Sequence, residues 1–185
     1  MKTFNYKKLI EDFRVTYRTF EQYESRTWGA EGNLIETYKQ IGELIHCHNC
    51  DNERLADEIL DVVAQMIRLC DFYELNIEEI FERVIKMSDS NNDIVQTILN
   101  MVEQIGILSK YIMVKEKYYF RSRVNDSNYM ISSEKFIECI TTVIHLSLHI
   151  ANEKNVDLNE TSIQARKTDQ EWFSKIAKQE KKYVK

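Results

Sequence analysis

Apolar side chains recur every three or four positions along most of the chain, which is the spacing of an amphipathic α-helix. In residues 4–24 the pattern is carried by Phe4, Leu9, Ile10, Phe13, Tyr17, Phe20 and Tyr23. Two glycines interrupt it in residues 25–32, where we expect Trp28 to fill the junction between helices. A second helix is predicted over residues 33–47. A third, over residues 52–73, is apolar around most of its circumference and is expected to be buried.

The rest of the chain has the same helical periodicity. Residues 76–87 predict a short helix, and the polar segment SDSNND, residues 88–93, predicts a linker. Further helices are predicted over residues 93–119, from a cap at Ser132 or Ser133 to Asn152, and over residues 157–172. A polar loop is expected at 120–133, and the charged C-terminal segment KQEKKYVK is expected to fray.

Two short segments recur along the chain. QIG at 40–42 reappears at 104–106, and LNIEE at 75–79 resembles VDLNE at 156–160. The order of elements around both pairs is the same, so we interpret the chain as a tandem duplication of a helical hairpin. Gly42 lies inside the second predicted helix, where glycine costs about 1 kcal/mol relative to alanine. We therefore expect another helix to approach closely at Gly42.

The predicted domain organisation follows from this repeat, because two hairpins can pack into a four-helix bundle. The chain is expected to form a single all-α domain over residues 1–185. Its first repeat spans 28–87, and a degenerate second repeat spans 92–173. The acidic residues discussed next occur only in the first repeat, which predicts one site with the second repeat as its support.

Acidic and amide side chains share one face of the second and of the third predicted helix. Glu36, Gln40 and Glu43 follow at spacings of three or four residues, and so do Glu58 and Asp61. Because the third helix is otherwise apolar, its acids are expected to face a cleft, where they repel one another unless cations bind. Mg²⁺ prefers carboxylates together with water and phosphate oxygens. The two faces therefore predict a site for Mg²⁺, or Mn²⁺, between these helices.

Composition and charge narrow the function classes. The chain has no proline and only four glycines, fewer than a turn-rich β fold needs. A net charge of −5 disfavours binding to a nucleic-acid duplex, which usually requires a basic face. No apolar run approaches the roughly 18 residues of a membrane span, and the N-terminal segment lacks the apolar core of a signal peptide. We expect a cytoplasmic protein with free thiols and no membrane partner.

The acidic spacing resembles that of the MazG-like all-α nucleotide pyrophosphohydrolases. Their pattern is ExxE followed, after a spacer, by ExxD. This chain has Gln40-x-x-Glu43 within KQIGEL and then Glu58-x-x-Asp61, and LNIEEIFERVIKM looks like the helix that follows in the family. Glu36, one helical turn before Gln40, offers a carboxylate in place of the missing first acid. The resemblance covers the first repeat and, more weakly, the second.

The resemblance implies hydrolysis of a nucleoside or deoxynucleoside triphosphate to the monophosphate and pyrophosphate. Mg²⁺ would neutralise phosphate oxygens and lower the pKa of a bound water. Either Glu43 or Glu58 would orient that water or accept its proton. The implied metal ligands are Glu36, Gln40, Glu43, Glu58 and Asp61. The side chains implied to contact phosphates are Lys39, Arg68, Arg83 and Lys86.

Other interpretations stay open. Gln40 and the acid-poor second repeat also fit a binding or scaffold protein of the same fold whose catalytic site has been lost. The segment HCHNC, residues 46–50, would need a second pair of ligands to hold zinc. A di-iron bundle would need a second Glu-x-x-His pair besides Glu43 and His46. The residues expected in the core are Cys70, Cys139, His145 and His149. Strongly apolar helix faces favour a homodimer.

Overall fold

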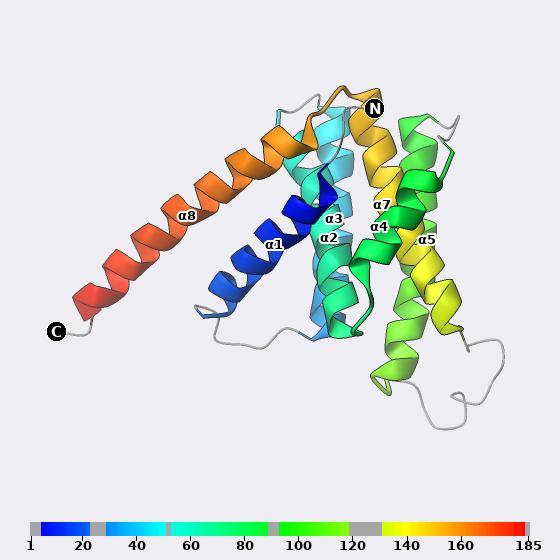
Figure 1. The fold of residues 1–185 in the computed structure, drawn as a ribbon, viewed down its shortest axis with the longest axis horizontal. Coiled ribbons are helices and arrows are strands. Elements are labelled where there is room, and N and C mark those ends of the chain that lie inside the picture. The colour runs from blue at the N-terminus through cyan, green and yellow to red at the C-terminus, as the bar shows by residue number, and fades with distance from the viewer. Residues whose placement is uncertain (1–4, 23–28, 51–52, 89–92, 119–130, 184–185) are drawn as a thin grey trace.

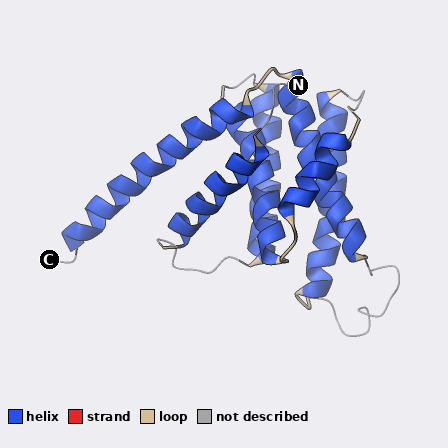
Figure 2. Ribbon diagram, in the orientation of Figure 1, coloured by secondary structure: helices blue, strands red, loops and turns tan. Residues whose placement is uncertain are grey.

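The computed structural model describes residues 5–22, 29–50, 53–88, 93–118 and 131–183, with side chains described as far as residue 176. These residues form seven helices and no strand (Figure 2), so the predicted all-α fold is confirmed. The helices are α1 (Tyr6–Glu21), α2 (Ala30–Asn49), α3 (Leu55–Phe72), α4 (Ile77–Lys86), α5 (Ile94–Lys115), α7 (Ser133–Glu153) and α8 (Leu158–Tyr183). None of the described helices combines the length and apolar character needed to cross a bilayer.

Two helical hairpins form the body of the molecule. Helix α2 packs against α3, and α5 packs against α7; α3 then contacts α7, and α2 contacts α5. In Figure 1, α2 and α5 run in opposite directions. The other helices pack on the outside of this bundle: α4, which follows α3, lies on α7, whereas α8, which follows α7, lies on α3 together with α1. The helix that follows each hairpin in the chain therefore packs against the other hairpin.

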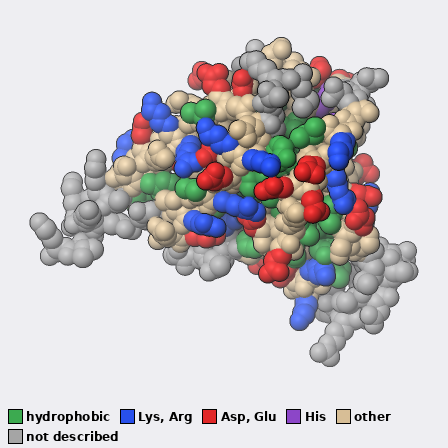
Figure 3. Space-filling model, viewed as in Figure 1, with side chains coloured by type: hydrophobic (Ala, Val, Ile, Leu, Met, Phe, Trp, Pro, Cys, Tyr) green, Lys and Arg blue, Asp and Glu red, His purple; other side chains and the backbone are tan. Residues whose placement is uncertain are grey.

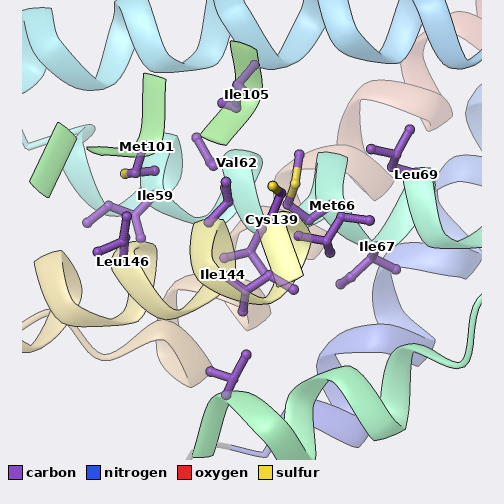
Figure 4. Close-up of a cluster of buried hydrophobic side chains, with 14 of the residues drawn as sticks. Ile59, Val62, Met66, Ile67, Leu69, Met101, Ile105, Cys139, Ile144 and Leu146 are labelled. Atoms are coloured by element: carbon purple, nitrogen blue, oxygen red, sulfur yellow. The ribbon is translucent and has the colours of Figure 1, made fainter. Parts of the chain in front are cut away.

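The core lies where α3, α5 and α7 meet. Figure 4 shows Ile59 and Met66 of α3, Met101 and Ile105 of α5, and Cys139 and Ile144 of α7 directed toward one another. Burying an aliphatic side chain of this size contributes about 1.5–3 kcal/mol. The core positions predicted for Cys70, Cys139, His145 and His149 are confirmed, because all four side chains are buried. All four cysteines of the chain are free thiols.

The connectors that leave the two hairpins share one backbone geometry. Glu74 after α3 and Asn155 after α7 have φ values of 53° and 55°, in the left-handed region. The next residue then donates its N–H to the carbonyl five positions earlier, at 2.9 Å for Leu75 and 2.8 Å for Val156. This arrangement satisfies carbonyls left open at a helix end. The same geometry also ends α5, where Lys117 has φ of 61° and Tyr118 N donates to Met113 O at 2.9 Å, so the match does not test the duplication, which stays a prediction.

The predicted end of the last helix is wrong. We expected it to stop at Trp172 and the segment after residue 177 to fray, but α8 continues to Tyr183. Lys, Gln and Glu favour helix, and no glycine or proline interrupts the segment. The cap predicted at Ser132 or Ser133 is Ser132, whose hydroxyl accepts a hydrogen bond from Lys135 N at 3.1 Å.

The reason given for Gly42 is also wrong within this chain. Among the described residues, no atom from outside its local helix lies within 4 Å of the position that a Cβ on Gly42 would occupy. None of the described helices therefore makes the close approach expected there. The position predicted for Trp28 lies outside the described residues, as do most of the 88–93 linker and the 120–133 loop.

Candidate functional site

A cleft of about 450 Å³ lies between α3 and the three helices α1, α2 and α8. Helix α3 lines it with residues one turn apart, Asp57, Asp61, Ala64, Gln65 and Arg68, together with Leu60. Helix α2 contributes Glu36 and Gln40. Because the remaining faces of α3 are packed in the core, its narrow polar stripe has only the cleft to face.

Helices α1 and α8 form the opposite walls of the cleft. Their lining side chains include Phe13, Tyr17 and Phe20 of α1 and Gln164, Thr168 and Asp169 of α8. An ion pair between Arg166 and Asp12 joins the two helices. The ring of Phe20 also packs against Trp172 and Phe173, with ring centroids 5.5 and 4.8 Å apart. One wall is therefore aromatic, whereas the α2 and α3 side is acidic.

Asp61 has the most unusual environment of the predicted acids. Its pKa is raised to about 7, first by burial and then by the negative charges of Glu58 and Asp57, against a lowering effect of Lys39. Burial also raises the pKa of Asp57, and burial together with the charge of Asp57 raises the pKa of Asp169. A cation in the cleft would relieve this repulsion and stabilise the charged forms.

Glu58 and Glu43 lie beside the cleft and do not line it. The Glu58 side chain is 1% exposed; its Oε1 accepts a hydrogen bond from Arg54 Nη2 at 2.5 Å, and its Oε2 has no hydrogen-bond partner. Burial raises the pKa of Glu58, Arg54 opposes this, and the charge of Glu43 raises it further. The predicted acids are therefore divided: Glu36 and Asp61 line the cleft with Gln40, whereas Glu43 and Glu58 form a separate pair.

Lys39 holds Glu36 in place. Lys39 Nζ lies 2.5 Å from Glu36 Oε1, and Gln40 Nε2 donates to the same oxygen at 3.2 Å. The hydrogen bond with Glu36 raises the pKa of Lys39. Gln40 therefore acts here as a hydrogen-bond donor to the neighbouring carboxylate, and its own carbonyl oxygen remains as an oxygen donor at the cleft.

The four predicted phosphate contacts are not brought together. Arg68 lines the cleft, with its guanidinium carbon 4.7 Å from the centroid of the Tyr17 ring. Lys39 is occupied by Glu36, as described. Arg83 instead pairs with Glu134 of α7 at 2.8 Å, and Lys86 is exposed at the end of α4. Neither Arg83 nor Lys86 lines the cleft.

The predicted metal ligands do not form a compact cluster. Within the described part of the chain, no three His, Cys, Asp or Glu side chains are close enough together to hold a metal ion. The cleft nevertheless supplies hard oxygen donors, the carboxylates of Glu36, Asp57, Asp61 and Asp169. Mg²⁺ commonly takes only one or two protein carboxylates and completes its shell with water and substrate phosphates. These donors are of the chemical type that Mg²⁺ takes, and other ligands would have to complete its shell.

Three cleft residues were missed as site candidates. Asp57 lies four residues before Asp61, so the same helical spacing could have identified it. Tyr17 and Asp169 carry no such signal, because only the packing of α1 and α8 on α3 brings them to the cleft. Gln65 has a fixed orientation, since its Oε1 accepts a hydrogen bond from buried Asn33 at 2.6 Å.

The face of the molecule in Figure 3 carries acidic, basic and hydrophobic side chains interspersed, without a large region of one sign. A broad basic patch, as duplex nucleic acid requires, is not seen among the described residues of that face. Comparison of the chain with protein-family models, with curated proteins and with solved structures finds no match.

Proposed function

We propose that this chain is a Mg²⁺-dependent nucleoside triphosphate pyrophosphohydrolase of the cytoplasm. The observation that carries the proposal is the acid-lined cleft in which Glu36, Gln40 and Asp61 meet an aromatic wall. Gln40 and Asp61 belong to the ExxE and ExxD pattern by which the chain resembles the MazG-like enzymes, and Glu36 lies one helical turn before Gln40. A negatively charged cleft of this kind binds a polyphosphate only if cations neutralise both sets of oxygens.

Asp61 and Glu36 are the residues proposed to hold the cation, with Gln40 offering its carbonyl oxygen. When bound, Mg²⁺ would neutralise phosphate oxygens and activate water for attack on the α-phosphorus. Asp57 or Asp169 would hold that water in place through hydrogen bonds. Both acids line the cleft in a partly desolvated environment, where their raised pKa values make them better proton acceptors.

Arg68 and Tyr17 are proposed to contact the rest of the substrate. The guanidinium of Arg68 lies over the Tyr17 ring, with its Nη2 4.0 Å from Glu21 Oε1, and it would pair with a phosphate from the aromatic side of the cleft. Stacking on an aromatic wall suits a planar base and is tolerant of base identity. Arg83 and Lys86 have no part in this arrangement.

The test is pyrophosphate release from the common ribo- and deoxyribonucleoside triphosphates in the presence of Mg²⁺ or Mn²⁺. We expect release from at least one substrate and a loss of about 100-fold or more in Asp61→Asn. Glu82→Gln removes one negative charge from the exposed face of α4 and should leave the rate unchanged. Absence of release from every substrate, or full activity in Asp61→Asn, would contradict the proposal.

One observation favours a second candidate, a nucleotide-binding protein without turnover. Glu58, the first acid of ExxD, is occupied by Arg54 and buried outside the cleft. If this pair persists in the bound state, the cleft loses one expected ligand or base. The two candidates differ in a direct way: the binding protein would show Mg²⁺-dependent nucleotide binding by calorimetry with no pyrophosphate formed.

A further inference from the structure

One side of the bundle is formed by α2 and α5 alone. The two helices contact each other, and Tyr38 Oη lies 3.2 Å from Ser109 Oγ. Among the described helices, α1 and α8 pack on α3, and α4 packs on α7. The apolar side chains left exposed on this α2–α5 face are Ile35, Tyr38, Ile45, Leu99, Val102 and Met113. Several exposed apolar side chains on two neighbouring helices are typical of an interaction surface.

Two glycines lie in the middle of the α2–α5 face. A Cβ added to Gly42 or to Gly106 would meet no atom within 4 Å outside its own helix. Glycine in a helix interior is unfavourable relative to alanine, and none of the described residues occupies the space left by the missing side chains. The two positions instead form notches in which a helix of another molecule can approach closely.

The sequence of α5 is symmetric about Gly106. Leu99 lies seven residues before this glycine and Met113 seven after it; Glu103 lies three before and Lys110 four after. When two copies of one helix cross antiparallel, each residue before the crossing point meets a residue at a similar distance after it. A crossing at Gly106 therefore pairs Leu99 of one copy with Met113 of the other, and Glu103 of one copy with Lys110 of the other.

The charges select a second copy over an unrelated partner. Glu103 and Lys110 are exposed, and neither forms an ion pair among the described residues. Glu103 does lie near α7, because its charge adds to the hydrogen bond with Glu138 in raising the pKa of Lys135. In an isologous dimer, Glu103 of each copy pairs with Lys110 of the other. The twofold axis therefore gives two such ion pairs. Leu99 and Met113, 56% and 36% exposed, become covered by the same contact.

We propose that the α2–α5 face is the interface of a homodimer in which the two α5 helices cross antiparallel at Gly106. The notches at Gly42 and Gly106 allow close packing, the apolar side chains supply the buried area, and the Glu103–Lys110 pairs fix the direction of the crossing. The cleft opens between α1, α2, α3 and α8, so this interface stands independently of the nucleotide chemistry.

Sedimentation equilibrium of the full chain up to about 100 μM, where even weak specific interfaces associate, should give a dimer. Glu103→Lys and Lys110→Glu should each weaken association about tenfold, because two attractive pairs become repulsive. The double variant Glu103→Lys/Lys110→Glu should restore most of the affinity, since the pairs re-form with reversed sign. An unrelated partner would give no such rescue.

Gly106→Leu fills the notch and should give a monomer with unchanged helical content, because the folded chain has room for the side chain. Ile163→Glu on α8 is the matched control: Ile163 is as exposed as Leu99, at 56%, and its replacement should leave the dimer intact. A monomeric wild-type chain over this range would overturn the proposal and leave the face to a different partner. A dimer unaffected by both Gly106→Leu and the charge reversals would overturn it as well.

Discussion

Arg54 and Glu58 form an ion pair one turn apart on α3, with Nη2 and Oε1 separated by 2.5 Å. The two side chains differ sharply in exposure: 61% for Arg54 and 1% for Glu58. Arg54 thus supplies the ion-pair partner of a buried carboxylate. In the proposed function, the same contact would keep Glu58 from acting as a ligand or base in the cleft.

Replacing Arg54 should therefore destabilise the fold more than removing the charge of Glu58. We expect Arg54→Met to lower the free energy of unfolding by about 2–3 kcal/mol at pH 7.5, because a buried charge loses its partner. Adding Glu58→Gln in the same background should recover most of this loss. Urea unfolding of the two single variants and the double variant measures the coupling. A loss below about 0.5 kcal/mol in Arg54→Met, typical of a surface pair, would contradict it.

The stability of the metal-free protein should fall as pH rises from about 4 to about 7. The folded-state pKa of Asp61 is raised to about 7, above its ordinary value of 3.8, so the folded state binds this proton more tightly than the unfolded state does. The resulting stabilisation is complete at low pH and is lost as Asp61 ionises. Thermal unfolding across this range should show the trend, superimposed on other titrations.

Asp61→Asn isolates the contribution of Asp61 to that pH dependence. It should be more stable than the wild type at pH 8 by about 2 kcal/mol and should show a flatter dependence between pH 5 and pH 8. Mg²⁺ should stabilise the wild type at pH 8 and have little effect at pH 5, where Asp61 is protonated. Parallel pH profiles for the wild type and Asp61→Asn would show that Asp61 is not the group responsible.

Glycine at the two positive-φ positions, Glu74 and Asn155, should change the free energy of unfolding by different amounts. Glu74→Gly should raise the free energy of unfolding by about 1 kcal/mol, because glycine adopts φ of 53° without the steric cost that glutamate carries. Asn155→Gly should gain less, since asparagine tolerates the left-handed region better. Chemical unfolding of both variants gives the comparison, and a destabilising Glu74→Gly would show that the Glu74 side chain has another role.

The aromatic cluster at one end of the bundle predicts a costly core substitution. Phe136 is 1% exposed; its ring centroid lies 4.0 Å from that of Tyr111 and 5.2 Å from that of Tyr73. Phe136→Ala should cost about 3–5 kcal/mol through the cavity it leaves, and Phe136→Leu clearly less. Equal small effects in the two variants would mean that the cluster collapses to fill the space.

The fold was largely readable from the sequence because the helices have clear periodicity and α1, α4, α5 and α7 each begin at a residue whose side chain caps the helix. The apolar positions of α3 and α7 identified the core, and the polar residues before α5 and α7 identified helix starts. The extent of α8 was not readable in the same way, because its last turns carry no apolar face. Gly42 is unusual for a helix interior, but none of the described residues packs close enough to explain it.

The site was only half readable. Spacing on one helix placed Asp61 correctly and could have added Asp57. It could not show that Glu58 would be buried under Arg54, outside the cleft that Glu36 lines. Tyr17 and Asp169 come from helices far away in sequence, so only the crossing of α1 and α8 over α3 defines them as neighbours of Asp61.

The most direct test is calorimetric titration of a non-hydrolysable nucleoside triphosphate analogue into the protein, with and without Mg²⁺. Binding should require Mg²⁺, should be lost in Asp61→Asn and should persist in Glu82→Gln. Binding that is equally tight without Mg²⁺ or in Asp61→Asn, or no binding under any condition, would contradict the conclusion that this acidic cleft holds a polyphosphate through a divalent cation.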